Sequence, residues 1–314
     1  MRKSNHLLLV LSLLTLPLAS RGAYLVNDTW LDGTRTDPAS PTYAENNGVV
    51  GTDADLDGNL ESAWFKGGAG TLSVIGAGGP LRGTGNAAAS ASWYTYFTQP
   101  GTPVTLANAG DALRLTWAFT PTGVNANNTS QGFNLAVVLA PSRMTADGSV
   151  PSAAYLGYAS FMNMGQTLGN ANPFQLRRWT NPGSSGALLG TSGNWTSVGN
   201  GATSGNPGYA SGTQYTYVMT LTRNAGNGLD IVSTMTGGNL NGTGSATVSW
   251  TDTTAAQGFS FDMFDIRPTS EATTATTFDT SLFQIEFTQV PEPSSAALAG
   301  LGVLGLALWR RVRQ

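Results

Sequence analysis

Apolar and polar residues alternate one by one through two long segments in the middle of this chain. Successive side chains of a β-strand point to opposite faces, so the alternation predicts strands with one buried face. The residues expected to face a core are Leu113, Leu115, Trp117, Phe119, Tyr215, Tyr217, Met219 and Leu221. The residues expected on the opposite faces are Arg114, Thr116, Thr216 and Thr220.

Further strands are predicted at residues 133–139, 229–235, 247–251, 259–266 and 283–287. Asn227-Gly228 separates two of the alternating segments, and both residues tolerate the positive φ that a tight hairpin turn requires. No pattern of an amphipathic helix occurs between residues 24 and 290. Many strands joined by Gly-rich turns in one contiguous body predict an all-β protein, most simply a β-sandwich.

The composition limits the partners of this body. Six of the 15 basic residues and one of the 18 acidic residues lie in the two ends of the chain, which leaves residues 23–290 with a net charge of −8. Lys66 is the only lysine there. Nucleic-acid binding depends on neutralising phosphates, so we expect no nucleic-acid partner.

The catalytic chemistry open to the body is limited as well. The chain has no cysteine, and its only histidine, His6, lies near the N-terminus. Catalytic triads, His/Cys zinc sites, haem and iron–sulfur clusters are therefore excluded from the body. Carboxylate chemistry and cations held by oxygen atoms remain.

The first 22 residues have the layout of a secretory signal peptide. Arg2 and Lys3 precede a short apolar run at residues 7–18, and Ser20 and Gly22 offer a small-x-small cleavage site before Ala23. The run is too short for an ordinary membrane span. The alternative is an uncleaved N-terminal anchor.

The other end also carries a short apolar segment. Pro291-Glu292-Pro293 leads into an apolar run at residues 296–309, and Arg310, Arg311 and Arg313 follow at once. As a helix this run spans about 21 Å, against a hydrocarbon core of about 30 Å. We expect a short transmembrane helix whose arginines stay cytoplasmic and whose body lies outside.

The order Pro-Glu-Pro, short apolar helix and basic end resembles a PEP-CTERM sorting signal, over the 24 residues 291–314. In that family the tail is read by a membrane enzyme, exosortase, and the substrates are linked to exopolysaccharide and biofilm matrix. The resemblance implies an exported protein, anchored transiently by its C-terminal helix and then found at the cell surface or outside. The alternative is a generic tail anchor. The domains are then residues 1–22, 23–290 and 291–314.

The body itself resembles, more loosely, the jelly-roll sandwich of concanavalin-like lectins and glucanases. The resemblance rests on the hairpin at residues 215–235 and on the final strand Phe283-Gln284-Ile285-Glu286-Phe287. It implies a β-sandwich and, among its members, either glycan binding or carboxylate-dependent glycan cleavage.

A candidate Ca²⁺ loop is formed by Asp53, Asp55 and Asp57, followed by Gly58. Alternate carboxylates before a glycine match the first half of an EF-hand loop. The twelfth position is Trp64 instead of glutamate, although Asn59 or Glu61 would complete a shorter loop. The alternative is a solvated acidic turn with no metal, and no other cofactor is predicted.

Trp179 and Trp195 are candidate glycan contacts, because each stands beside turn residues and an exposed indole stacks on a sugar ring. The alternative is that both rings cover the ends of the sandwich.

We predict no catalytic residues and no enzyme. The glucanase pattern Glu-x-Asp-x-x-Glu, the phosphate-binding loop and the dinucleotide fingerprint are all absent from the sequence. The predicted function is that of a surface or matrix protein whose body is structural or binds extracellular polysaccharide. The alternative, a glycoside hydrolase or lyase, needs a groove with two facing carboxylates.

Both ends of the chain should be removed in a host that has exosortase. Mass spectrometry of surface material should find a protein that starts near Ala23 and lacks Arg310–Gln314. Intact arginines on the mature protein would contradict the sorting signal and leave simple tail anchoring.

Overall fold

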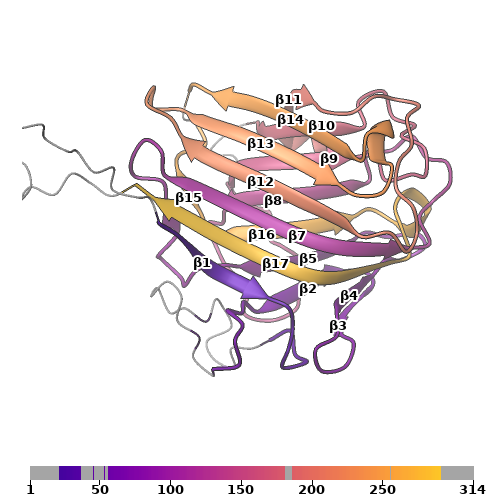
Figure 1. The fold of residues 1–314 in the computed structure, drawn as a ribbon, viewed down its shortest axis with the longest axis horizontal. Coiled ribbons are helices and arrows are strands. Elements are labelled where there is room, and N and C mark those ends of the chain that lie inside the picture. The colour runs from indigo at the N-terminus through magenta and orange to yellow at the C-terminus, as the bar shows by residue number, and fades with distance from the viewer. Residues whose placement is uncertain are drawn as a thin grey trace, which may run out of the picture. The chain divides into compact units, whose positions relative to one another are not determined.

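The computed structural model describes residues 21–36, 45, 53, 56–180, 186–254 and 256–290, and residues Gly22–Gln289 form one compact unit. Two large sheets face each other (Figure 1). Residues 1–20 of the predicted signal peptide and the predicted C-terminal helix lie outside the described residues, whereas Arg21 and Gly22 begin the first strand. No helix in the described part of the chain is long and apolar enough to cross a membrane.

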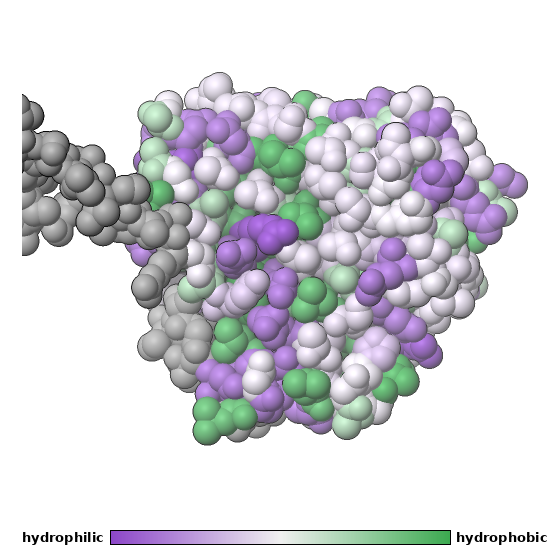
Figure 2. All heavy atoms as spheres, viewed as in Figure 1, coloured by the Kyte–Doolittle hydropathy of each residue, from purple (hydrophilic) through white to green (hydrophobic). Residues whose placement is uncertain are grey.

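The eight-stranded sheet has the order β14-β13-β12-β7-β17-β4-β3, and β1 pairs with β17. Its strands are β1 (Arg21–Asp28), β3 (Thr71–Val74), β4 (Leu81–Thr84), β7 (Ala112–Thr122), β12 (Tyr215–Arg223), β13 (Leu229–Thr236), β14 (Ser245–Asp252) and β17 (Thr277–Gln289). Its outer face carries threonine, serine and charged side chains between scattered apolar ones (Figure 2).

The seven-stranded sheet has the order β11-β10-β9-β8-β16-β5-β2. Its strands are β2 (Trp64–Gly68), β5 (Ala91–Tyr96), β8 (Phe133–Leu139), β9 (Leu156–Met162), β10 (Phe174–Trp179), β11 (Trp195–Asn200) and β16 (Met263–Pro268). The strands β6 (Val104–Thr105) and β15 (Ser260–Phe261) form a small third sheet. The short 3-10 turns are η1 (Ser192–Asn194), η2 (Leu240–Gly242) and η3 (Glu271–Thr273).

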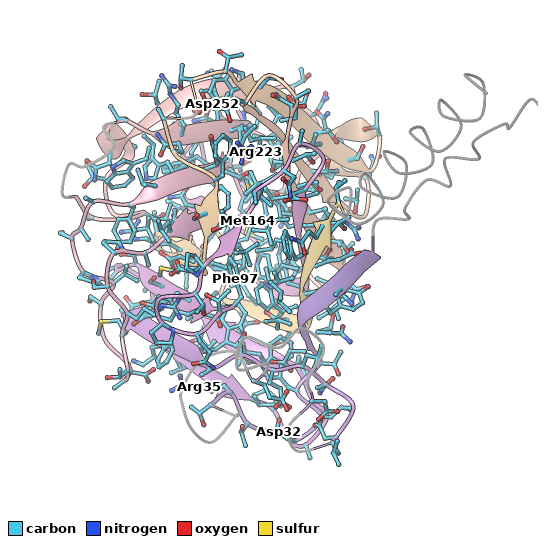
Figure 3. The ribbon with its side chains drawn as sticks, turned by 90° about the vertical axis from the view of Figure 1, so that its left-hand side faces the viewer. Asp32, Arg35, Phe97, Met164, Arg223 and Asp252 are labelled. Carbon is cyan, nitrogen blue, oxygen red and sulfur yellow. The ribbon has the colours of Figure 1, made fainter. Side chains whose placement is uncertain are left out.

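The main core fills the space between the two large sheets. All eight residues that the alternation predicts to be inward are at most 1% exposed. The Trp117 ring stacks on Phe119 with centroids 4.1 Å apart, and its Nε1 donates to Thr280 Oγ1 at 3.0 Å. Phe97 and Met164 lie in the same interior, seen along the strands in Figure 3. The sandwich and its inward faces are therefore confirmed.

The register follows from the same alternation. Tyr217 pairs with Trp117 across β12 and β7, and Phe283 pairs with Trp117 across β17 and β7. Cross-strand partners share a face, so the core residues of neighbouring strands meet side by side. The turn predicted at Asn227-Gly228 is part of a five-residue loop, residues 224–228, in which Asn227 has a φ of 60° and its N donates to Asn224 O at 3.2 Å, whereas Gly228 does not take a positive φ.

Thr116 lies on the outward face, as predicted, but its side chain is largely covered. It is only 8% exposed, because its neighbours on β12 and β17 flank it closely. Thr220 and Thr216 are partly exposed, as an outer face predicts. Thr220 is therefore the better control for the substitution below.

A second apolar layer covers the outer face of the seven-stranded sheet. Its buried members include Phe65, Tyr94, Tyr96, Tyr155, Phe161, Trp179, Leu188, Leu189 and Trp195. The loops that lead into β9 and β11 supply Tyr155, Leu188 and Leu189. This sheet is thus buried on both faces, which the sequence pattern did not predict.

Replacing Trp117 by alanine should lower the free energy of unfolding by about 3–5 kcal/mol, because it empties a buried site between the sheets. Thr220→Ala should cost less than about 1 kcal/mol, since this side chain is on the outer face. Denaturant titrations of both variants give these values. Equal costs would contradict the assignment of faces.

Candidate functional site

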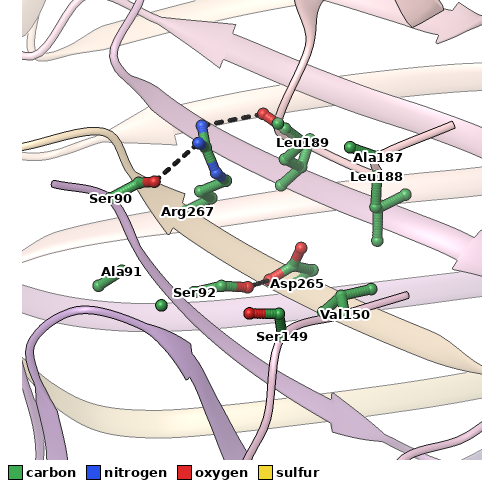
Figure 4. A pocket seen from close by; sticks show the side chains of 12 residues that line it. Ser90, Ala91, Ser92, Ser149, Val150, Ala187, Leu188, Leu189, Asp265 and Arg267 are labelled. Carbon is green, nitrogen blue, oxygen red and sulfur yellow. Dashed lines mark hydrogen bonds between the residues drawn. The ribbon is translucent and has the colours of Figure 1, made fainter. Parts of the chain in front are cut away.

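A pocket of about 190 Å³ lies on the outer face of the seven-stranded sheet (Figure 4). Its floor comes from β5 and β16, and its walls come from the loop segments around Val150 and Leu188. The lining residues are Gly68, Ser90, Ala91, Ser92, Ser149, Val150, Ala187, Leu188, Leu189, Gly190, Asp265 and Arg267. We call it the Asp265–Arg267 pocket.

Asp265 and Arg267 share one face of β16 because they stand two residues apart on a strand. This face is the outer one, since Ile266 between them points into the main core. Asp265 lies opposite Tyr94 on β5 and opposite Ala136 on β8. The strand alternation therefore places a carboxyl and a guanidinium side by side on a floor that loops cover.

Asp265 is a buried acid. It is 1% exposed, and Ser92 Oγ donates to its Oδ1 at 2.6 Å. Burial raises the pKa of Asp265 from its ordinary value of 3.8 to about 7, although the Ser92 hydrogen bond and the positive charge of Arg267 act in the opposite direction. Its protonation therefore changes near neutral pH.

Arg267 is half-buried and is held by two neutral acceptors. Its Nη1 donates to Leu189 O at 3.0 Å, and its Nη2 donates to Ser90 Oγ at 2.8 Å. Burial lowers the pKa of Arg267, and the nearby Asp265 raises it. Within the described part of the chain, no carboxylate lies within 4.0 Å of this guanidinium.

The pocket combines polar groups with an apolar wall. Arg267 and the serine hydroxyls donate hydrogen bonds, Asp265 accepts them, and Val150 and Leu188 supply apolar contact. This arrangement suits a small ligand rich in hydroxyl groups, and the lining holds a single carboxylate.

The sequence analysis did not identify Asp265 and Arg267 as site residues. Two charged residues at alternate positions of an otherwise apolar strand were the available signal. The serine residues of the pocket gave no such signal in the sequence, because serine is frequent throughout this chain.

Trp179 and Trp195 lie elsewhere than predicted. They pair at the ends of β10 and β11, with ring centroids 5.1 Å apart and planes at 88°. They are 2% and 4% exposed, and Trp195 Nε1 donates to Leu188 O at 2.6 Å. Protein atoms cover both rings in this structure, and glycan contact at these residues stays a prediction. Their burial agrees with the alternative that they close over the sheet.

The acidic loop is described in part, since Asp55 lies outside the described residues. Asp53 accepts hydrogen bonds from Leu56 N at 2.5 Å and from Gly58 N at 2.9 Å, and Asp57 accepts one from Asn59 N at 2.7 Å. Across the described ranges, no three acidic side chains converge closely enough to hold a metal ion.

Three further carboxyls lie near this loop. Asp28, Glu45 and Glu61 are each at most 3% exposed. Burial raises the pKa of Asp28 to about 8. The hydrogen bond from the Trp30 backbone lowers this pKa, and the charges of three nearby acids raise it, namely Asp32, Asp57 and Glu45. The region is therefore richer in buried acids than the sequence motif predicts.

The sorting residues Pro291, Glu292, Pro293, Arg310 and Arg311 lie outside the described residues. The structure describes the strand that leads to them, β17, which ends at Gln289.

The burial of Trp195 can be tested by two substitutions. Trp195→Ala should lower the free energy of unfolding by about 3–5 kcal/mol through the emptied space. Trp195→Phe should lose about 1 kcal/mol through the missing hydrogen bond to Leu188 O. A cost below about 1 kcal/mol for the alanine variant, measured by denaturant titration, would show an exposed ring.

The stability of the body should depend on pH through Asp265. Between about pH 4 and about pH 7 the folded state keeps a proton on this group that the unfolded state releases. Its contribution to the free energy of unfolding therefore falls as pH rises through this window, by at most about 1.4 kcal/mol per pH unit. Asp265→Asn should remove this slope in titrations across the window. An unchanged slope would show that Asp265 is already ionised.

Residues 289–312 match the family described as the PEP-CTERM protein-sorting motif. No curated protein sequence matches the chain. The motif predicted from Pro-Glu-Pro, the apolar run and the basic end is therefore confirmed.

Solved structures of similar fold share little sequence with this chain. The exoplasmic/lumenal domain of VIP36, in a Ca²⁺/Man2-bound form, is 14% identical over 78% of this chain and 87% of that one, with a TM-score of 0.45. The carbohydrate recognition domain of Emp46p, in a potassium-bound form, is 10% identical over 71% and 87%, with a TM-score of 0.43. Peanut lectin is 8% identical over 72% and 93%, with a TM-score of 0.42. The chain thus carries a PEP-CTERM sorting motif behind a two-sheet β-sandwich that is similar to these lectin domains.

Proposed function

We propose that this protein is an exported, non-enzymatic surface or matrix protein that binds extracellular glycan in the Asp265–Arg267 pocket. The sorting motif at residues 289–312 supports export and processing by an exosortase. Before processing, the apolar run at residues 296–309 anchors the chain in the membrane, and afterwards the body stays at the cell surface or in the matrix.

The observation that carries the binding proposal is the chemistry of the pocket. A sugar ring presents hydroxyl groups at its rim and C–H groups on its faces. In the pocket, Arg267, Ser149 and Asp265 can form hydrogen bonds with the sugar hydroxyl groups. Val150 can pack against the C–H groups of a ring face. Such a mixture of apolar wall and a few fixed polar groups is typical of small-ligand sites. Its volume suits one sugar unit at the end or side of a chain.

The same pocket gives little support to the alternative of a glycan-cleaving enzyme. Glycoside hydrolysis generally uses two carboxyl groups on either side of the scissile bond. Among the described residues that line the pocket, Asp265 is the only one with a carboxyl group. Binding without cleavage therefore fits these residues better.

Blocking the pocket should abolish binding on a glycan array that presents charged and neutral polysaccharides. Ser149→Trp places a bulky ring at the exposed rim of the pocket, whereas Ser142→Trp adds the same ring to an exposed position of the same loop outside it. We expect loss of signal for the first variant and wild-type signal for the second. Equal binding by both would place the glycan elsewhere.

We propose in addition that the acidic loop of Asp53, Asp55 and Asp57 binds Ca²⁺. The supporting observation is that Asp28, Glu45 and Glu61 gather near the loop, since carboxylate oxygens are the ligands that Ca²⁺ prefers. Asn59, 3% exposed and opposite Asp28 across the Asn27–Leu60 bridge, offers a further oxygen.

Excess Ca²⁺ should then raise the melting temperature by mass action, with about 2.7 kcal/mol of stabilisation at 100 times the dissociation constant. Asp57→Asn should weaken the rise, and Glu271→Gln, which removes an acid far along the chain, should leave it unchanged. No shift at millimolar Ca²⁺ in the wild type would leave the solvated turn as the correct interpretation.

A further inference from the structure

We propose that the Asp265–Arg267 pocket selects a sugar that carries a carboxylate, such as a uronic acid residue, over the neutral sugar of the same shape. This inference rests on the proposed glycan-binding function and adds the chemical class of the sugar. It follows from the partners of the arginines, from the donors around the pocket and from the position of Asp265.

Arg267 differs from the other arginines whose side chains are described in joining a place at a pocket to neutral partners, although Arg177 and Arg223 also have only neutral hydrogen-bond acceptors. Five of them lie within 4.0 Å of a carboxylate, namely Arg35, Arg82, Arg114, Arg143 and Arg178. Arg177 and Arg223 place the guanidinium over the rings of Phe161 and Phe259, each 4.2 Å from the centroid. Arg267 instead lines a pocket and has the neutral acceptors Leu189 O and Ser90 Oγ.

A half-buried guanidinium has lost part of its hydration shell. Its hydrogen-bond partners here are neutral, so no directly bonded anion compensates that loss. Its two hydrogen bonds to the protein use two of its five N–H donors. A carboxylate can accept two parallel hydrogen bonds from one guanidinium, and such charge-assisted pairs are roughly twice as strong as neutral ones. The two protein contacts also fix the side chain, so little entropy is lost when an anion binds.

The groups beside Arg267 are mostly donors. Ser90 Oγ accepts from Arg267, which leaves its own hydroxyl hydrogen to donate into the pocket. Ser149 adds a hydroxyl at the rim. A carboxylate of the ligand would therefore meet Arg267 and two hydroxyl groups, while the ring hydroxyls reach Asp265.

Asp265 adds a dependence on pH. Its ionised form repels a ligand carboxylate, and its protonated form donates a hydrogen bond to one. The titratable groups that face it are Arg267 on β16, Tyr94 on β5 and Tyr155 before β9. The wall segments Ser149–Val150 and Ala187–Gly190 carry none, and β8 places Ala136 opposite it. Since burial raises the pKa of Asp265 to about 7, binding of a uronate should weaken as pH rises through neutrality.

Calorimetry on the full chain in detergent micelles tests the selection with methyl glucuronide and methyl glucoside, which differ only in a carboxylate in place of the C6 hydroxymethyl group. At about pH 6 we expect the glucuronide to bind at least about tenfold more tightly. Arg267→Gln should remove this preference and Arg267→Lys should keep part of it. Arg177→Gln, which removes a different arginine without an ion pair, should change nothing.

The outcomes separate the inference from the function on which it rests. Equal or tighter binding of the glucoside overturns the selection of a carboxylate and leaves glycan binding in this pocket standing. Binding of neither sugar by a folded wild type overturns both. Loss of preference in Arg177→Gln to the same degree as in Arg267→Gln would show a general effect of charge and overturn the role of Arg267.

A second arm tests Asp265. The wild type should bind the glucuronide more weakly at about pH 8 than at about pH 6, whereas Asp265→Asn should bind equally at both. The glucoside should show little dependence on pH in either protein. Identical affinity of the wild type for the glucuronide at both values would remove Asp265 from the selection. Circular dichroism of each variant verifies that it is folded.

Discussion

The packing of Trp179 against Trp195 on the outer face of the seven-stranded sheet supports one wall of the Asp265–Arg267 pocket. The two rings meet at 5.1 Å and cover a face that would otherwise be open, and Trp195 Nε1 fixes Leu188 O at 2.6 Å. Leu188 and Leu189 are thereby held over β16, where Arg267 donates to Leu189 O. Among the described residues of this loop, Leu188 and Leu189 form one wall of the Asp265–Arg267 pocket, and β16 provides its floor.

Two aspartates near one another in the chain show how burial is compensated in different ways. Asp262 accepts from Arg143 at 2.8 Å and from Ala140 N at 2.8 Å, and both charged side chains are less than 10% exposed. Burial still raises the pKa of Asp262, although Arg143 opposes it. Asp265 has no such ion pair among the described residues and keeps a neutral partner, Ser92. A buried acid and a half-buried arginine that do not pair with each other are expensive to maintain, which is reasonable where a ligand completes their interactions.

The sequence predicted the fold where burial follows from alternation alone. The residues from Leu113 to Phe119 and from Tyr215 to Leu221 have one apolar and one polar face, and a period of two is sufficient to place them. It failed where burial depends on distant loops. Trp195 stands among glycine, serine and asparagine, which indicates a surface turn, yet Phe161 of β9, Trp179 of β10 and the loop residue Leu188 contact it. The pocket was missed for the same reason, because its walls come from segments that are far apart in the sequence.

The two ends of the body also meet in a way that bears on export. Gly22, the residue before the predicted cleavage bond, lies in β1 against the end of β17, so that an added Cβ would come 2.2 Å from Glu286 Oε1 and 3.1 Å from Thr288 Oγ1. Asn27 Oδ1 accepts from Gln284 Nε2 at 2.7 Å further along the same strand pair. A strand that is paired in a sheet is a poor protease substrate, because its backbone groups are already engaged. Since β17 is the last strand to be made, β1 can pair with it only when the body is nearly complete, whereas the bridge between Asn27 and Leu60 needs only an early segment of the chain. The bond predicted to be cleaved before Ala23 thus lies in the strand that pairs with β17, and the matched sorting motif begins at Gln289, the last residue of β17.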